Sequence, residues 1–306
     1  MDCLGFWSAY IRNETILYFD CIKVWPTWQN YYKDILGNES FETLVIPGTH
    51  DSGTYTRFST VGDNALMKYA ITQDESIYNQ LVYGNRYIDL RAGYFVASEE
   101  HYWLVHGVTV WRPFKEVLQD AKAFAEQSNE IFILEVGGFT YFENEEHHLG
   151  LIKLIEDEIG HLMIPNSFSY QTTLNEFWAM NRNIILIYGN SDYLNQEHLW
   201  KSFPSRWSNT QSIEALESYM IQVLEVDDPI SPPWHLSGQL TPLADDVILD
   251  KLDGLRAMAD AVNRNVTRWY REKWINKLSF TSCDFFLSAG YIDLAIETNI
   301  QKFKYN

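Results

Sequence analysis

Short apolar runs recur along the chain, and the gaps between them are long enough to hold a helix each. Each run is rich in Ile, Val, Leu, Phe or Tyr, and several are almost continuously apolar. Such runs are typical of strands buried on both faces of a parallel sheet. We expect strands over residues 43–46, 87–91, 102–105, 131–136, 183–188, 220–224 and 278–284.

Amphipathic patterns with a helical period fill the gaps between these runs. One helix is expected to begin at Pro113, because proline is favoured in the first turn and apolar residues follow at helical spacing. Further helices are predicted over residues 143–161, over a short segment at 175–178, and from residue 244 to about 274.

Alternating strands and helices predict a parallel sheet with its helices on the outside. With 306 residues and seven or eight strands, we expect an α/β protein built as a single TIM-like (β/α) barrel. A doubly wound open sheet is the alternative, but the chain has no glycine-rich dinucleotide-binding loop to favour it.

The charge of the chain limits the classes of partner that it can bind. The net charge is −18 and the sequence pI is about 4.8, whereas a nucleic-acid-binding protein needs a basic stripe. The acidity also argues against broad electrostatic adhesion to an anionic membrane. A phosphate ester is not excluded, because one local arginine is enough to bind it.

The cysteines and the N-terminus leave the compartment open. An odd number of cysteines gives no disulfide framework, although Cys3 and Cys21 could pair in a secreted protein, and Cys283 is expected to be a buried thiol. The first twenty residues do not resemble a signal peptide, and no apolar stretch is long enough to span a membrane. The expectation is a cytoplasmic protein, or a secreted one if the N-terminus is incomplete.

Five polar residues follow or end the predicted strands. His50 and Asp51 come after the first strand, Arg91 ends the second, His106 follows the third, and Asp284 ends the last. Because the chemistry of such barrels gathers at the C-terminal ends of the strands, we expect these side chains to share one rim. Imidazoles exchange protons near neutral pH, and a guanidinium fork matches phosphoryl oxygens. The set is therefore suited to breaking a phosphodiester by acid–base catalysis.

Each of these residues also has a plainer interpretation. Either histidine could be a satisfied core or turn residue, and Asp284 could cap the helix that follows it. Asp89 shares a strand face with Arg91, so the two could form a buried ion pair that closes the barrel. Glu135 ends the fourth predicted strand. It either contacts a substrate hydroxyl or is a polar residue in one of the side-chain layers that fill the barrel.

Five tryptophans lie near predicted loops. They could form a membrane-facing rim, but partly buried loop anchors are the favoured interpretation. These residues are Trp103, Trp111, Trp200, Trp207 and Trp234.

Four motifs in order carry a resemblance to a known family. They are Ile-Pro-Gly-Thr-His-Asp-Ser-Gly at 46–53, Asn-Arg-Tyr-Ile-Asp-Leu-Arg at 85–91, Val-His-Gly at 105–107 and Ile-Phe-Ile-Leu-Glu at 131–135. The set resembles the phosphatidylinositol-specific phospholipase C X-domain family, in its barrel-only, calcium-independent form. The resemblance covers residues 39–300, so we expect a lead-in segment over 1–38 and a distorted TIM-like barrel domain over 39–306.

The resemblance also implies roles for the site residues. His50 matches the general base that deprotonates the inositol 2-hydroxyl, and Asp284 matches its orienting carboxylate. Arg91 matches the group that stabilises charge on phosphorus. His106 matches the general acid that protonates the departing diacylglycerol, and Asp51 matches its support.

The substrate implied is a phosphoinositide or a glycosylphosphatidylinositol, cleaved to diacylglycerol and a cyclic inositol phosphate. We expect Asp89 and Glu135 to bind the substrate, contact with the membrane surface to be transient, and the protein to be a monomer.

One position predicts independence of metal ions. Calcium-dependent members of the family place a carboxylate where this chain has Arg91 and an asparagine where it has Asp51. Calcium requires oxygen ligands, and a guanidinium offers none. We therefore expect no metal and no other cofactor.

Two other functions remain open at this point. A glycerophosphodiesterase or a venom-type phospholipase D would share the barrel and the histidines, but it would use a metal bound by a Glu-x-Asp pair. This chain has Asp89-Leu90-Arg91 at that place. The third possibility is a binding protein on the same scaffold that does not turn over its ligand.

Overall fold

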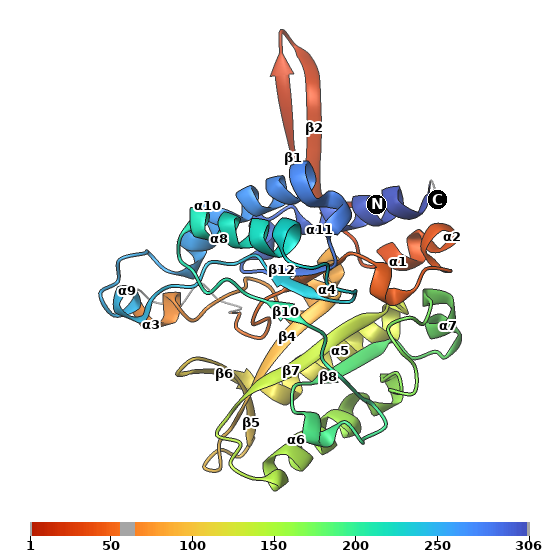
Figure 1. Ribbon diagram of the computed structural model, residues 1–306, viewed down its shortest axis with the longest axis vertical. Coiled ribbons are helices and arrows are strands. Elements are labelled where there is room, and N and C mark those ends of the chain that lie inside the picture. Colours follow the sequence, from red (N-terminus) through yellow and green to blue (C-terminus); the bar gives the residue numbers. More distant parts are fainter. Residues whose placement is uncertain (1, 56–64, 305–306) are drawn as a thin grey trace.

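The structure, a computed structural model, describes residues 2–55 and 65–304. Its centre is a curled parallel sheet with helices on the outside (Figure 1). The strands follow the spatial order β10, β11, β12, β3, β4, β7, β8, β9. Their bounds are β3 Ile46–Thr49, β4 Tyr87–Tyr94, β7 Phe132–Thr140, β8 Ile184–Tyr188, β9 Leu199–Trp200, β10 Ser205–Arg206, β11 His235–Ser237 and β12 Phe280–Cys283.

The sheet curls far enough to bring β9 and β10, which are consecutive in the chain, to its two ends. This open seam distinguishes the architecture from a closed barrel. The predicted α/β class and distorted TIM-like form are confirmed.

The near-continuous apolar runs have a simple explanation in the packing. In β8, Ile185 and Ile187 pack inside the curled sheet, whereas Ile184 and Leu186 pack outward against the helices. Both faces of the strand are therefore buried, and neither face can be polar.

Helices cover the outside of the sheet. The longer ones are α4 Ile77–Tyr83, α5 Phe114–Ser128, α6 Glu145–Ile159, α7 Leu174–Ala179, α8 Ile213–Ile221, α10 Leu255–Trp269 and α11 Tyr291–Lys304. Shorter ones are α1 Trp28–Tyr31, α2 Lys33–Leu36, α3 Ala65–Lys68 and α9 Ala244–Ile248. The predictions of a helix after Pro113 and of a short helix at 175–178 are confirmed, and the second begins with a Thr173–Glu176 capping box. No helix in the described part of the chain has the length and apolarity needed to cross a bilayer.

Three predicted elements differ from the structure. The strand expected at 43–46 shares only Ile46 with β3, because residues 41–43 form a 3-10 turn and β3 runs on to Thr49. The strand expected at 220–224 is the end of α8 and a following π turn, because Met220, Val223 and Leu224 have helical spacing and pack together in one outer core cluster. The long helix expected from 244 is broken into α9 and α10. Between them Asp250, Asp253 and Gly254 have positive φ angles, which a helix cannot accommodate.

Two hairpins were not predicted. Residues 102–105 belong to β5 Tyr102–His106, which pairs antiparallel with β4 and with β6 Thr109–Pro113 and is not a barrel strand. The other hairpin, β1 Asp2–Arg12 and β2 Thr15–Val24, stands out from the barrel (Figure 1).

The cysteines differ in state. Cys21 on β2 is disulfide-bonded, and Cys283 is free and buried as expected. The side chain of Cys3, which the sequence offers as a partner for Cys21, lies outside the part that is described.

Candidate active site

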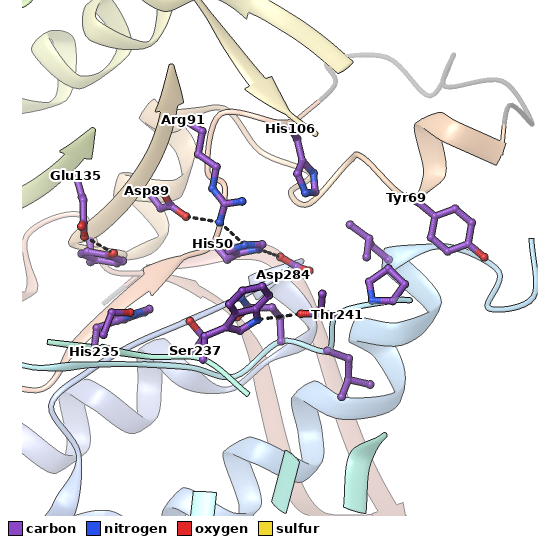
Figure 2. Close-up of a pocket in the computed structure, with 17 residues that line it drawn as sticks. His50, Tyr69, Asp89, Arg91, His106, Glu135, His235, Ser237, Thr241 and Asp284 are labelled. Carbon is purple, nitrogen blue, oxygen red and sulfur yellow. Dashed lines mark hydrogen bonds and ion pairs between the residues drawn. The ribbon is translucent and has the colours of Figure 1, made fainter. Parts of the chain in front are cut away.

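A pocket of about 480 Å³ opens at the C-terminal ends of the strands (Figure 2). Six of the seven predicted site residues line it, and the seventh, Asp51, lies buried directly behind them. The six are His50, Asp89, Arg91, His106, Glu135 and Asp284. Sequence positions 234 residues apart are thus brought into contact, as the rim argument predicts.

His50 and Asp284 meet because their strands are neighbours. Cys283 at the end of β12 is paired with Thr49 at the end of β3, so the next residue of each strand comes to the same edge. His50 Nδ1 lies 2.7 Å from Asp284 Oδ1, and the backbone N–H of His50 donates to the Cys283 carbonyl at 3.1 Å. Asp284 is 3% exposed, so it can orient the imidazole without competition from water.

Arg91 determines the protonation state of His50. Arg91 Nη2 lies 2.6 Å from His50 Nε2 (Figure 2). A guanidinium can only donate, so Nε2 must accept and Nδ1 must carry the proton that is donated to Asp284. His50 is therefore neutral, with a lone pair on the nitrogen that faces the pocket, which is the state of a general base.

Two carboxylates flank the guanidinium. Arg91 Nη2 lies 3.3 Å from Asp89 Oδ2, and Nη1 lies 3.5 Å from Asp51 Oδ2. Burial acts to raise the pKa of Asp89, but the charge of Arg91 and the backbone N–H of Asp51, which donates to Asp89 Oδ2 at 3.0 Å, hold that pKa below its usual value. Burial also works against the charge on Arg91, whereas Asp89 and Asp51 raise its pKa. The ion pair expected of Asp89 and Arg91 is therefore present, at the edge of the pocket.

Asp51 is held in an unusual state. Its backbone has a positive φ of 42°, and its side chain is 1% exposed. Burial raises its pKa to about 7, although the charge of Arg91 opposes the rise. The carboxyl group lies between Arg91 and His106, so its proton can respond to the charge on either neighbour.

His106 faces His50 across the pocket, with 6.2 Å between the ring centroids. Its Nδ1 donates to the carbonyl of Ala70 at 2.8 Å, whereas Asp51 Oδ2 lies farther away at 3.6 Å. The Ala70 carbonyl therefore fixes the ring, a partner that no sequence signal indicates. Burial lowers the pKa of His106. Its Nε2 is left without a described hydrogen bond and is available for proton transfer.

A second cluster lines the other side of the pocket. Tyr87 donates to Glu135 Oε2 at 2.5 Å, and its ring lies against His235 with centroids 4.9 Å apart. His235 is bonded at both nitrogens, to Ser205 at 3.0 Å and to Ser282 at 2.9 Å. Burial raises the pKa of Glu135 to about 7 and lowers that of His235 to about 4. At neutral pH His235 is therefore uncharged, and Glu135 is protonated to about one half.

The sequence analysis did not identify Tyr87 or His235. Tyr87 could have been found, because it is two residues before Asp89 and so shares the inward face of the strand with Asp89 and Arg91. His235 gives no such signal, since β11 has three residues and follows the Pro232-Pro233 segment.

The candidate tryptophan rim is largely absent. Trp200 and Trp234 are buried and Trp103 and Trp111 are half-buried, in keeping with loop anchors. Trp207 alone of the five is exposed, at 51%, and it lines the pocket, where its indole N–H donates to Thr241 at 2.9 Å.

Comparison with known proteins gives a consistent set of relatives. No family model matches the chain. The chain is 27% identical over 247 residues to mouse PI-PLC X domain-containing protein 2, which covers 72% of this chain and 71% of the relative. It is 22% identical over 299 residues to human PI-PLC X domain-containing protein 3, covering 89% and 92% respectively.

Solved structures agree at the level of the fold. The phosphatidylinositol-specific phospholipase C of Listeria monocytogenes has a TM-score of 0.66 and 19% identity, over 89% of this chain and 98% of that one. A mutant of the Staphylococcus aureus enzyme has a TM-score of 0.67 and 15% identity, over 90% and 97%. The resemblance that the motifs predict is thus confirmed: the chain is similar in sequence to the PI-PLC X domain-containing proteins and in fold to bacterial phosphatidylinositol-specific phospholipases C.

Proposed function

We propose that this protein is a phosphoric diester hydrolase that cleaves phosphatidylinositol-type lipids by acid–base catalysis. The observation that carries the proposal is the arrangement of three groups around one pocket. His50 presents an unprotonated Nε2, His106 lies opposite with its ring fixed, and Arg91 lies beside His50.

The first step is an attack by the substrate's own 2-hydroxyl on phosphorus. The hydroxyl replaces Arg91 Nη2 as the partner of His50 Nε2 and gives its proton to that nitrogen. His50 becomes an imidazolium, which the buried Asp284 stabilises. The new O–P bond closes a cyclic inositol phosphate, while the bond from phosphorus to the diacylglycerol oxygen breaks.

His106 completes the step by protonating the departing oxygen from Nε2. Burial lowers the pKa of His106, so its imidazolium is a stronger acid than a free one, and the ring must take up a proton on Nε2 before the step begins. Asp51 behind the ring can offset the positive charge of His106 while it is protonated. Arg91, displaced from His50, binds the phosphoryl oxygens, where negative charge builds up.

The positive charge at phosphorus comes from Arg91 in this proposal, so no metal ion is required. The guanidinium lies between Asp51 and Asp89, the carboxylates that a divalent ion would otherwise attract. A metal-dependent glycerophosphodiesterase or phospholipase D would need those oxygens to be free.

The headgroup is proposed to bind on the side of Asp89 and Glu135. His235 is uncharged near neutral pH and Glu135 is partly protonated, so this surface offers both donors and acceptors to the hydroxyl groups of a polyol. Trp207 and the exposed Leu243 and Leu249, which follow the pocket-lining segment at residues 239–242, are proposed to touch the membrane surface transiently. Nothing in the charge of the chain suggests a nucleic-acid partner.

The test uses phosphatidylinositol vesicles with excess chelator, and the water-soluble products are followed by phosphorus NMR. We expect a cyclic inositol phosphate, and we expect His50→Ala and His106→Ala each to lower turnover by about a hundredfold or more. Tyr141→Ala, an exposed change, serves as the control. Turnover that requires added metal would support the phosphodiesterase alternative, and binding without any product would support a non-catalytic protein.

A further inference from the structure

Gln239 lines the pocket, and its side chain has no part in the mechanism proposed above. The residue is 3% exposed, and its Oε1 is buried without a hydrogen-bond partner in the protein. A buried amide oxygen that lacks a donor costs free energy, and native proteins contain few of them. The unpaired oxygen therefore indicates a ligand of the pocket that supplies the donor.

The strand before Gln239 directs its side chain into the pocket. His235 and Ser237 of β11 line the pocket (Figure 2), and Gln239 continues the same alternation of two, which brings it to the same face. In the parallel register between β11 and β12, Ser237 is paired with Ser282. Two residues further on, the same register brings Gln239 beside Asp284. Gln239 thus lies next to the carboxylate that orients the general base.

The segment that carries Gln239 is held on both sides. The N–H of Gly238 donates to a carbonyl of β12 at 2.9 Å, and the N–H of Thr241 donates to the Thr210 carbonyl at 2.7 Å. Leu240 is 5% exposed and packs in the outer core cluster. The amide is therefore presented by a fixed backbone, which is what precise binding of a ligand requires.

The missing group is a hydrogen-bond donor, and the proposed substrate limits where it can come from. An ionised phosphodiester and the acyl esters have no hydrogen to donate, whereas a ring hydroxyl both donates and accepts. The attacking 2-hydroxyl gives its proton to His50, and ring carbon 1 carries the phosphate. The free hydroxyl next to the attacking one is therefore the 3-hydroxyl.

We propose that Gln239 binds the 3-hydroxyl of the inositol ring, a contact that rests on the function proposed above. The 3-hydroxyl donates to Oε1 and so holds the neighbouring 2-hydroxyl against His50. The amide is neutral, so it does not compete with Arg91 for the phosphate. Such a contact discriminates between ligands, because an analogue without the hydroxyl leaves a buried polar group unpaired.

The test is a cycle of two chains and two substrates. Phosphatidylinositol and its 3-deoxy analogue are presented in vesicles with excess chelator to the unaltered chain and to Gln239→Met. On phosphatidylinositol the variant should lose about tenfold or more in kcat/KM, the effect of one lost hydrogen bond. On the 3-deoxy analogue the two chains should be equal, because the partner of Gln239 is already missing.

Two controls separate this contact from a general disturbance of the pocket. Gln171→Met makes the same change at an exposed position outside the pocket and should leave kcat/KM unchanged on both substrates. On the 4-deoxy analogue, Gln239→Met should lose as much as on phosphatidylinositol, since the 3-hydroxyl is present. If Gln239→Met loses nothing on phosphatidylinositol, or loses equally on the 3-deoxy analogue, the proposal is overturned.

Stability gives a readout that a structural role would move in the opposite direction. In the ligand-free protein, Gln239→Met removes a buried oxygen that has no partner, so the midpoint of urea unfolding should stay equal or rise. A clearly lower midpoint would make Gln239 a structural residue and would overturn the proposal.

Binding of a soluble headgroup separates the contact from catalysis. Calorimetry with inositol 1-phosphate should show about tenfold weaker binding by Gln239→Met, and equal binding of its 3-deoxy analogue by both chains. If the unaltered chain forms no product but shows this pattern, the proposed function fails and the Gln239 contact stands. If the unaltered chain does not bind inositol 1-phosphate, or if both chains bind it equally, the contact is wrong whether or not turnover is found.

Discussion

One guanidinium sets the charge state of the pocket. Arg91 is within 3.5 Å of atoms on His50, Asp51 and Asp89, so it holds the base unprotonated and keeps the Asp89 carboxylate ionised at once. A lysine at this position could not reach all three, because its ammonium is a single point charge.

Glu135 supplies a prediction about stability and pH. Burial raises its pKa from 4.5 to about 7 in the folded protein, so between these values the folded state binds more protons than the unfolded state. Glu135 therefore contributes a fall in the free energy of unfolding as the pH rises from about 5 to 8. Glu135→Gln keeps an acceptor for Tyr87 but cannot ionise, so it should remove about 2 kcal/mol of that fall.

Urea unfolding at pH 5 and pH 8 measures the effect. Glu143→Gln, at an exposed position, is the control and should leave the pH dependence as it is. The free energy of unfolding of the Glu135→Gln variant could fall between the two pH values by as much as that of the unaltered chain. That result would contradict the prediction that Glu135 is buried in its protonated form.

At the scale of the elements, the approach of β3 to β4 determines the shape of the pocket. Gly48 on β3 is paired with Tyr87 on β4, and a Cβ at residue 48 would lie 2.5 Å from the Tyr87 carbonyl oxygen. Gly48→Ala must therefore push the two strands apart, and we expect a loss of about 2 kcal/mol or more in the free energy of unfolding.

Gly137→Ala is the matched control, because a Cβ there would meet no atom within 4 Å and its φ is not positive. Replacing glycine in a strand with alanine should leave stability equal or slightly higher. Chemical denaturation measures the free energy of unfolding of both variants. Equal losses in the two variants would show that the close contact between β3 and β4 at Gly48 does not cause the loss of stability.

The elements also show how far sequence reasoning reaches. Strand β8 could be predicted because both of its faces are apolar, and the meeting of His50 and Asp284 because their parallel strands end together. The short strands β9, β10 and β11 were not predicted, and His106 lies on the antiparallel strand β5. The strand predicted at 220–224 was wrong because a short apolar run does not distinguish a buried helix from a strand. The Ala70 carbonyl and His235 could not be predicted, since backbone groups and a three-residue strand leave no pattern to read.

At the scale of the whole molecule, the structure suggests a different place for the domain boundary than residue 38. Trp28 and Leu36 are 1% and 0% exposed and belong to the core inside the barrel. The backbone N–H groups of Gln29 and Asn30 donate to Glu130, which also pairs with Arg86 at 2.8 Å, and both members of that pair are fully buried. We therefore propose that residues 25–38 complete the barrel, whereas the β1–β2 hairpin before them does not.

Two truncations separate these possibilities. Removing residues 1–24 deletes the β1–β2 hairpin alone, so the remaining chain should keep its fold and a midpoint of thermal unfolding within a few degrees of the unaltered value. Removing residues 1–38 deletes Trp28 and Leu36 from the core, where losses of such side chains cost about 3–5 kcal/mol each. It also strips partners from the buried Glu130, and a domain of marginal stability should not withstand both. A stable chain beginning at residue 39 would contradict this account and restore the boundary inferred from the motifs. If instead only the chain that begins at residue 25 is stable, then residues 25–38 belong to the barrel.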